Sequence, residues 1–257
     1  MIESEISELL FYWAKEVEQN QFAKDDPVQI PRQYSRKEDV EISGFFTAIM
    51  AWGQRKTIIN KSRELMQLFD NAPHDFIINH TASDLARLNT FKHRTLTHID
   101  VISLIQFFQS HYIEHKSLET AFFSDSVVLE KSDFVYYALA HFSDKFANSP
   151  HPRRTEKHIS SPKKNSACKR LNLYLRWMIR KNSPVDFGIW NRIGPEHLMC
   201  PLDLHVQRVA LELGILTRAT ADWKACVELT NYLKKIYPQD PVYFDYALFG
   251  IGVLRQK

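Results

Sequence analysis

Apolar residues recur along most of this chain at the three- and four-residue spacing of amphipathic helices. The first such stripe lies between residues 2 and 20 and consists of Ile6, Leu9, Leu10, Trp13 and Val17. Similar stripes predict further helices at 41–53, 57–70, 99–112, 132–147, 222–237 and 242–253. No alternating pattern is long enough to predict a sheet, so we expect an all-α fold.

Two more expected helices, between Ser160 and Gly214, begin with chemically distinctive residues. Their apolar faces are Leu171, Tyr174, Leu175 and Met178 in the first, and Val206, Val209, Ala210 and Leu213 in the second. Lys169 lies in the first turn of the first helix. Asp203 is the expected N-cap of the second, which follows Pro201 and stops at Gly214. A lysine and a carboxylate that meet at two helix N-termini could act as an amine nucleophile and its electrostatic partner.

The turn before Lys169 is basic and begins with Pro162. Lys163, Lys164, Asn165 and Ser166 follow it, and Asn165 is the non-glycine residue best suited to a left-handed conformation. Exposed backbone N–H groups beside two lysines would suit a phosphate group. A basic, proline-marked stretch is also typical of plain solvated surface.

Composition narrows the class of protein without naming a function. Glycine accounts for only 7 of 257 residues, which disfavours Rossmann, P-loop and turn-rich β architectures. The net charge of +3 permits nucleic-acid binding but does not require it. No apolar run approaches the roughly 18 residues of a membrane span, and the acidic start is not a signal peptide. We therefore expect a cytoplasmic protein.

Cysteine and histidine spacing argues against a metal or cofactor. Cys168, Cys200 and Cys226 form no C-x-x-C pair, so we expect three reduced, buried thiols. Four clustered cysteines would be needed for an iron–sulfur cluster. His93 and His98 are five residues apart, which does not place two ligands on one helix face.

The two helix starts resemble the core of the helix-hairpin-helix DNA glycosylase superfamily. In that superfamily a hairpin precedes a helix with a catalytic lysine, and a P-V-D-x-H stretch supplies a catalytic aspartate. The matching stretches here are Cys168-Lys169-Arg170-Leu171 and Pro201-Leu202-Asp203-Leu204-His205. The long spacing between lysine and aspartate is most similar to the archaeal 8-oxoguanine glycosylase branch. The hairpin departs from the superfamily, because Lys164, Asn165 and Ser166 stand where glycines are usual.

Over its whole length, the chain also resembles a bacterial family of about this size. The motifs that carry this likeness are FFTAIMAWGQR, FKHRTLTH, CKRLNLYLRWMIR, DFGIW, PLDLHVQRVA and DYALFGIG.

The resemblance to the glycosylases implies two helical subdomains, with a helix-hairpin-helix element and a cleft between them. Residues 1–257 would form a single glycosylase-like unit. One subdomain would combine 1–55 with 222–257, and the other would span 56–221, with the hairpin at 153–180.

The implied activity is base-excision repair of double-stranded DNA that contains a damaged base. The enzyme would remove an oxidised purine such as 8-oxoguanine through a lysine Schiff base, with AP-lyase activity. We expect a monomer that associates with the nucleoid and needs no cofactor.

Site residues follow by matching the motifs position by position. The catalytic pair would be Lys169 and Asp203. The base-binding residues would be Trp52, Gln54, Asp245 and Phe249. The DNA-binding residues would be Lys163, Lys164, Asn165, Ser166, Arg170 and Arg208. Arg208 could contact phosphate or pair with an acid.

Other interpretations stay open. A helix-hairpin-helix protein could bind DNA or RNA without cutting a glycosidic bond. Lys169 could be a surface lysine and Asp203 only a helix cap, while Trp52 and Phe249 could be core residues. His74-Asp75 suggests a metal-dependent phosphohydrolase, but no histidine precedes His74 to complete such a site.

Overall fold

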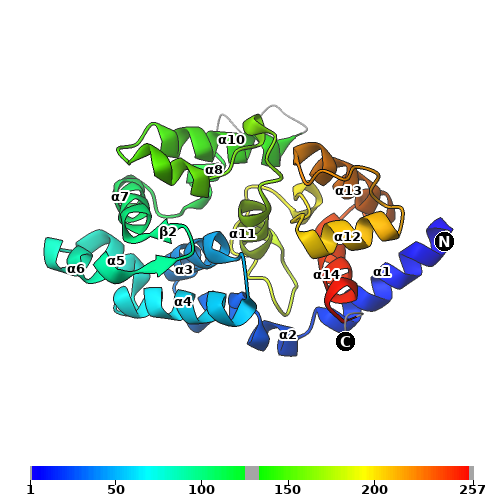
Figure 1. The fold of residues 1–257 in the computed structure, drawn as a ribbon, viewed down its shortest axis with the longest axis horizontal. Coiled ribbons are helices and arrows are strands. Elements are labelled where there is room, and N and C mark those ends of the chain that lie inside the picture. The colour runs from blue at the N-terminus through cyan, green and yellow to red at the C-terminus, as the bar shows by residue number, and fades with distance from the viewer. Residues whose placement is uncertain (1, 125–132, 255–257) are drawn as a thin grey trace. The chain divides into compact units, whose positions relative to one another are not determined.

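The computed structural model describes residues 2–124 and 133–254 and consists mainly of helices (Figure 1). Within these ranges, the strands are limited to β1 (Lys92–His93) and β2 (Leu96–Thr97), an antiparallel pair in which Lys92 lies opposite Thr97. The predicted all-α class is therefore confirmed. None of the described helices is both long enough and apolar enough to cross a membrane.

The chain divides into two compact units. The terminal unit comprises Met1–Lys24 and Ser161–Lys257, and the central unit is Asp25–Ser160. This division places the N- and C-terminal helices in one unit, with boundaries at 24/25 and 160/161, whereas the resemblance implied boundaries at 55/56 and 221/222. The helix before Trp52 belongs to the central unit because it packs on its sequence neighbours. The stretch 153–180, where the hairpin was expected, crosses the boundary at Ser160.

The terminal unit is built around its last helix, α14 (Phe244–Leu254), drawn in red in Figure 1. It packs against α1 (Glu3–Val17) and α12 (Leu204–Glu212). Two glycines permit this close approach. An added Cβ at Gly250 would lie 2.4 Å from Val17 Cγ2, and one at Gly252 would lie 3.1 Å from His205 Cβ. The remaining elements are α2 (Asn20–Asp25), η5 (Pro162–Lys164), α11 (Lys169–Ile179), η6 (Pro195–His197), α13 (Trp223–Ile236) and η7 (Pro241–Tyr243).

The central unit surrounds α3 (Lys37–Met50), which is buried from Val40 to Met50. Aromatic rings form much of this core, with Phe45 edge-on to Phe108 at 4.9 Å. The other helices are η1 (Pro27–Gln29), η2 (Pro31–Gln33), α4 (Arg55–Leu68), α5 (Pro73–Asn79), α6 (Ala82–Ala86), η3 (Arg87–Thr90), α7 (His98–Glu114), α8 (Glu119–Phe122), α10 (Phe134–Ala147) and η4 (Arg153–His158). Residue 132, the predicted start of α10, lies outside the described residues.

A fully buried carboxylate, that of Glu41, lies in the core of the central unit. It accepts hydrogen bonds from the Tyr112 hydroxyl at 2.8 Å, the Ser117 hydroxyl at 2.5 Å and the Leu118 backbone N–H at 3.0 Å. These donors replace the water that the carboxylate loses on burial. Glu41 thereby links α3 to α7 and to the turn before α8.

Candidate active site

Lys169 and Asp203 meet in the terminal unit. Lys169 is the first residue of α11, and its Nζ lies 3.3 Å from Asp203 Oδ2. The other carboxylate oxygen of Asp203 accepts the Val206 backbone N–H at 2.8 Å, which makes Asp203 the N-cap of α12. The lysine side chain is 33% exposed and the aspartate side chain 14% exposed. The predicted meeting of the two side chains is confirmed, and the pair is accessible to solvent from the lysine side.

Two left-handed residues turn the chain into α11. Asn165 has φ 55°, as predicted, and Cys168 has φ 49°, which the sequence did not indicate. The Cys168 backbone N–H donates to Ser166 Oγ at 3.2 Å, so a serine hydroxyl supports the turn. The chain thus makes this reversal without glycine, and the second left-handed residue places Lys169 at the helix start.

The same turn is fixed to the start of α13. Asn165 donates its side-chain amide to Asp222 Oδ2 at 3.0 Å, and its carbonyl accepts the Trp223 backbone N–H at 3.1 Å. Asp222 is the N-cap of α13, as the Ala225 N–H bond at 3.0 Å shows. Hydrogen bonds from Arg218, at 2.7 and 2.6 Å, are the main reason that the pKa of Asp222 lies far below its usual range.

The predicted DNA-binding residues differ in exposure and contacts. Lys163 and Lys164 are exposed, whereas Ser166 and Arg170 are half-buried. Burial lowers the pKa of the Arg170 guanidinium. Arg208 donates to the Gly252 carbonyl at 2.8 Å, and its Nε lies 3.7 Å from Glu212 Oε1. Arg208 thus has an acidic side chain beside it, and its predicted contact with phosphate stays a prediction.

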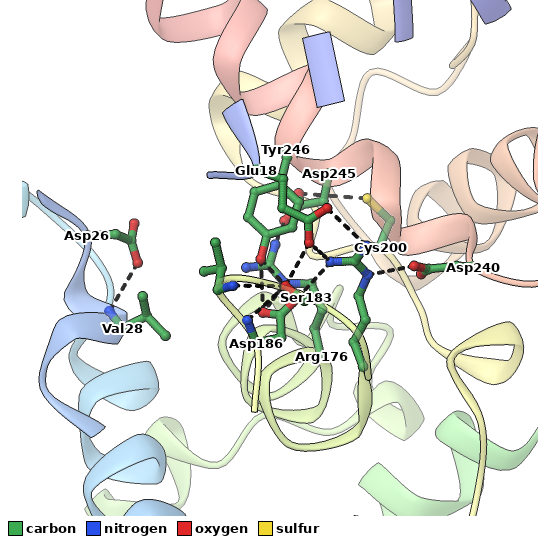
Figure 2. Close-up of polar contacts among 12 residues, drawn as sticks. Glu18, Asp26, Val28, Arg176, Ser183, Asp186, Cys200, Asp240, Asp245 and Tyr246 are labelled. Atoms are coloured by element: carbon green, nitrogen blue, oxygen red, sulfur yellow. Dashed lines mark hydrogen bonds and ion pairs between the residues drawn. The ribbon is translucent and has the colours of Figure 1, made fainter. Parts of the chain in front are cut away.

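Asp245, on α14, is only 6% exposed and is paired inside the protein (Figure 2). One carboxylate oxygen binds the Arg176 guanidinium, and the other lies 3.9 Å from Cys200 Sγ. Burial raises the pKa of Asp245 to about 6, although the positive charge of Arg176 lowers it. The buried carboxylate thus has a protein partner, which explains its presence without a bound base. The predicted base contact stays a prediction.

Arg176 and Asp245 are part of a larger buried network that sequence reasoning missed. It joins four carboxylates to two guanidinium groups and one phenol: Glu18, Asp186, Asp240, Asp245, Arg176, Arg180 and Tyr246 (Figure 2). Acids outnumber arginines, and burial raises the pKa of Asp240 as well as that of Asp245. A network with excess negative charge favours retained protons. Two arginines four residues apart on an apolar helix were the available signal.

The remaining base-binding candidates fall in both units. Phe249, on α14, is half-buried, and its ring centroid lies 6.2 Å from that of His205 and 6.0 Å from that of Phe22. Trp52 and Gln54 lie in the central unit. The Arg94 guanidinium lies 4.2 Å from the centre of the Trp52 ring, and Gln54 is exposed just before α4. The structure therefore groups Lys169 and Asp203 with the α14 candidates in one unit, and the predicted cleft between units stays a prediction.

The three cysteines are free and buried, so the prediction of buried thiols is confirmed. Burial raises the pKa of Cys200 and of Cys226. A raised thiol pKa disfavours the reactive thiolate. Within the described part of the chain, no three histidine, cysteine or acidic side chains come together as metal ligands.

Comparisons with known proteins identify a matching family, but they do not indicate an activity. A family model described as a protein of unknown function (DUF2400) matches residues 26–254. No curated protein and no solved structure matches the chain.

Proposed function

The chain belongs to the DUF2400 family, whose function is unknown, and we propose that it is a DNA glycosylase with Lys169 as nucleophile. The observation that carries this proposal is the 3.3 Å contact between Lys169 Nζ and Asp203 Oδ2 at two helix starts. An amine beside a carboxylate, both partly open to solvent, suits nucleophilic attack on an electron-poor carbon. The motif resemblance to lysine-dependent glycosylases supports the same chemistry.

In the proposed reaction, the damaged nucleotide leaves the base stack and enters the site. The neutral Lys169 amine attacks C1′ of the sugar, and the bond between C1′ and the base breaks. The base leaves with the bonding electron pair and takes up a proton. Opening of the sugar ring then gives an imine between the lysine nitrogen and C1′, from which the 3′ phosphate can be eliminated.

Asp203 has two tasks in this proposal. Its negative charge stabilises the positive charge that develops on the sugar, and its Oδ2, which faces Lys169, can accept a proton from the lysine ammonium. The hydrogen bond from Val206 fixes the carboxylate in place before substrate binds. Such a preformed charge needs no reorganisation during the reaction.

The proposed substrate is double-stranded DNA with an oxidised purine, 8-oxoguanine first. Lys163 and Lys164 are exposed six and five residues before Lys169 and would contact backbone phosphates. Phe249 is half-buried and would stack on the base. The choice of lesion rests on the resemblance to the 8-oxoguanine branch.

Borohydride trapping tests the proposal, because borohydride reduces the imine to a stable amine and leaves enzyme and DNA covalently joined. Duplexes with 8-oxoguanine, with uracil and without damage should be compared. We expect trapping on the 8-oxoguanine duplex, and Lys169→Gln should abolish trapping and base release while DNA binding survives. Lys235→Gln is the matched control, since Lys235 is an exposed lysine of α13 in the same unit.

The outcomes separate the alternatives. Trapping on uracil but not on 8-oxoguanine would show that the lesion is wrongly assigned. Trapping that survives Lys169→Gln would move the nucleophile to another lysine. Duplex binding without trapping on any lesion would overturn the enzymatic proposal and favour a non-catalytic nucleic-acid-binding protein.

A further inference from the structure

Asp245 contacts both segments that carry the proposed catalytic pair. One of its oxygens binds Arg176 on α11, the helix that begins with Lys169. Its other oxygen accepts the Cys200 S–H at 3.9 Å, and Cys200 stands three residues before Asp203. One carboxylate on α14 therefore connects the lysine segment to the aspartate segment.

The contact between Asp245 and Arg176 restricts the helix that begins with Lys169. Arg176 follows Lys169 by seven residues, and at about 100° per residue both side chains leave nearly the same face of the helix. Rotation of α11 about its axis would move both together. A carboxylate that holds Arg176 thus limits the rotation that would carry Lys169 away from Asp203.

The hydrogen bonds of Cys200 hold the segment that leads to Asp203. Cys200 is fully buried, and its backbone N–H donates to Thr230 Oγ1 at 3.0 Å. Its carbonyl accepts the Cys226 S–H at 3.2 Å. With Asp245 as the third partner, this residue is held from α13 and α14, which leaves little freedom to the short segment that leads to Asp203.

We propose that Asp245 is a positioning residue of this site, whose ionised carboxylate holds Lys169 and Asp203 in register. The proposal rests on the proposed function. Asp245 touches neither DNA nor the reacting atoms in this role, and it acts through Arg176 and Cys200. This role is an alternative to the base contact that the resemblance implied, which stays a prediction.

Asp245 must be ionised for this role, because Arg176 has a second acidic partner that it keeps when Asp245 is neutral. Arg176 Nε lies 3.3 Å from Asp186 Oδ1, and its guanidinium lies 4.3 Å from the centre of the Tyr246 ring. When Asp245 takes up a proton, Arg176 loses one anionic partner and keeps Asp186. The electrostatic attraction between Arg176 and Asp245 on α14 then weakens.

The charges that act on Asp245 come from several elements. Arg176 and Lys169 on α11 favour its ionised form, whereas Asp186 and Asp203 oppose it. Cys200, Cys226 and the adjacent Tyr246 are further titratable groups, and burial raises the pKa of each of them. With a pKa of about 6, Asp245 changes charge between mildly acidic and neutral solution.

The test compares Asp245→Asn with the parent chain across pH 5 to 8. Asparagine keeps the size of the side chain and resembles the protonated aspartate. The measured quantity is the single-turnover rate of trapping on the lesion duplex, expressed as the ratio of parent to variant at each pH. Dividing the two rates removes the pH dependence of steps that the substitution does not affect.

We expect the variant to react up to about 100-fold more slowly above pH 7, as for a misplaced catalytic group. The ratio should fall toward one below pH 6, where the parent is also protonated. Glu8→Gln, at an exposed carboxylate of α1 in the same unit, should keep a constant ratio near one.

Arg176→Gln provides a second test of the positioning role if Asp245→Asn folds poorly. Arg176→Gln removes the cation through which the ionised carboxylate acts on α11, so this variant should be slow at every pH and should lose the step in rate that the parent shows near pH 6. A ratio that is constant with pH for Asp245→Asn, or a step that persists in Arg176→Gln, would overturn the positioning role. Absence of trapping by the parent chain itself would instead overturn the proposed function.

Discussion

Asp203 performs two separable tasks, and substitutions can divide them. Oδ1 caps α12 through the Val206 N–H at 2.8 Å, while Oδ2 pairs with Lys169 at 3.3 Å. Asparagine caps a helix about as well as aspartate, whereas alanine in place of aspartate costs about 1 kcal/mol, within a range of about 0.5–2. The ion pair between these partly exposed groups adds about 0–1 kcal/mol. Both Asp203→Asn and Asp203→Ala lose the ion pair, so the difference between them isolates the cap.

We therefore expect Asp203→Ala to be less stable than Asp203→Asn by about 1 kcal/mol. The amide nitrogen of asparagine would face Lys169 Nζ, an unfavourable contact that the lysine relieves by moving into solvent. Under the proposed function, both variants lose the charge that would stabilise the sugar cation, and we expect a rate loss of about 10²–10³ in each. Stability and activity should thus respond differently to the same pair of substitutions.

Denaturant unfolding measures the first quantity and single-turnover base release the second. Tryptophan fluorescence reports mainly on the relevant unit, because four of the five tryptophans, Trp13, Trp177, Trp190 and Trp223, lie in the terminal unit. Equal stability of the two variants would refute the capping argument. An Asp203→Asn variant with the parental rate would show that the charge has no part in the reaction.

The central unit and the hairpin offer three further tests. Glu41→Ala removes the acceptor of two buried donors, the Tyr112 hydroxyl and the Leu118 N–H, at a cost of about 1–3 kcal/mol each, so hydrogen exchange in α3 and α7 should quicken. Glu41→Gln should be much milder because its amide oxygen still accepts hydrogen bonds. Burial lowers the pKa of His111 to about 4, below its unfolded value of about 6.5. The contribution of neutral His111 to the free energy of unfolding is therefore complete above pH 6.5, and about 3 kcal/mol of it is lost as the pH drops to 4. In urea titrations, His111→Gln should remove this pH-dependent loss of stability. Replacing Lys163 and Lys164 with alanine should weaken binding to all duplexes alike and reduce the slope of log affinity against log salt by about 0.9 for each phosphate that the lysines no longer neutralise; a change in lesion preference would contradict their positioning role.

The features that could be predicted from the sequence depend on neighbouring residues. The apolar stripes locate α7 and α13 within a few residues, because a one-sided helix repeats its apolar positions locally. Asp203 and Asp222 were identifiable as caps from their side chains and positions. Asn165 was identifiable as a left-handed residue for the same local reason.

The features that could not be predicted depend on distant partners. Periodicity shows that α3 has apolar faces but not which helices cover them, and the structure packs α3 on α4 and α5 in the central unit. Arg180 meets Glu18 and Asp240, which lie 162 and 60 residues away. The left-handed Cys168 has no local signal either, because it is a buried non-glycine residue supported by its surroundings.

The arrangement of the terminal unit brings the first and last helices together beside the proposed site. α14 reaches α1 through Gly250 and α12 through Gly252, and the same helix reaches α11 through Asp245. Arg180, one turn beyond Arg176, binds Glu18, which follows α1. The helix that carries Lys169 is therefore held by both terminal helices, and the helix that Asp203 caps packs directly on α14. In this arrangement, the geometry of the lysine and the aspartate depends on the packing of α1 and α14, so that the proposed catalytic pair would be complete only in the folded unit.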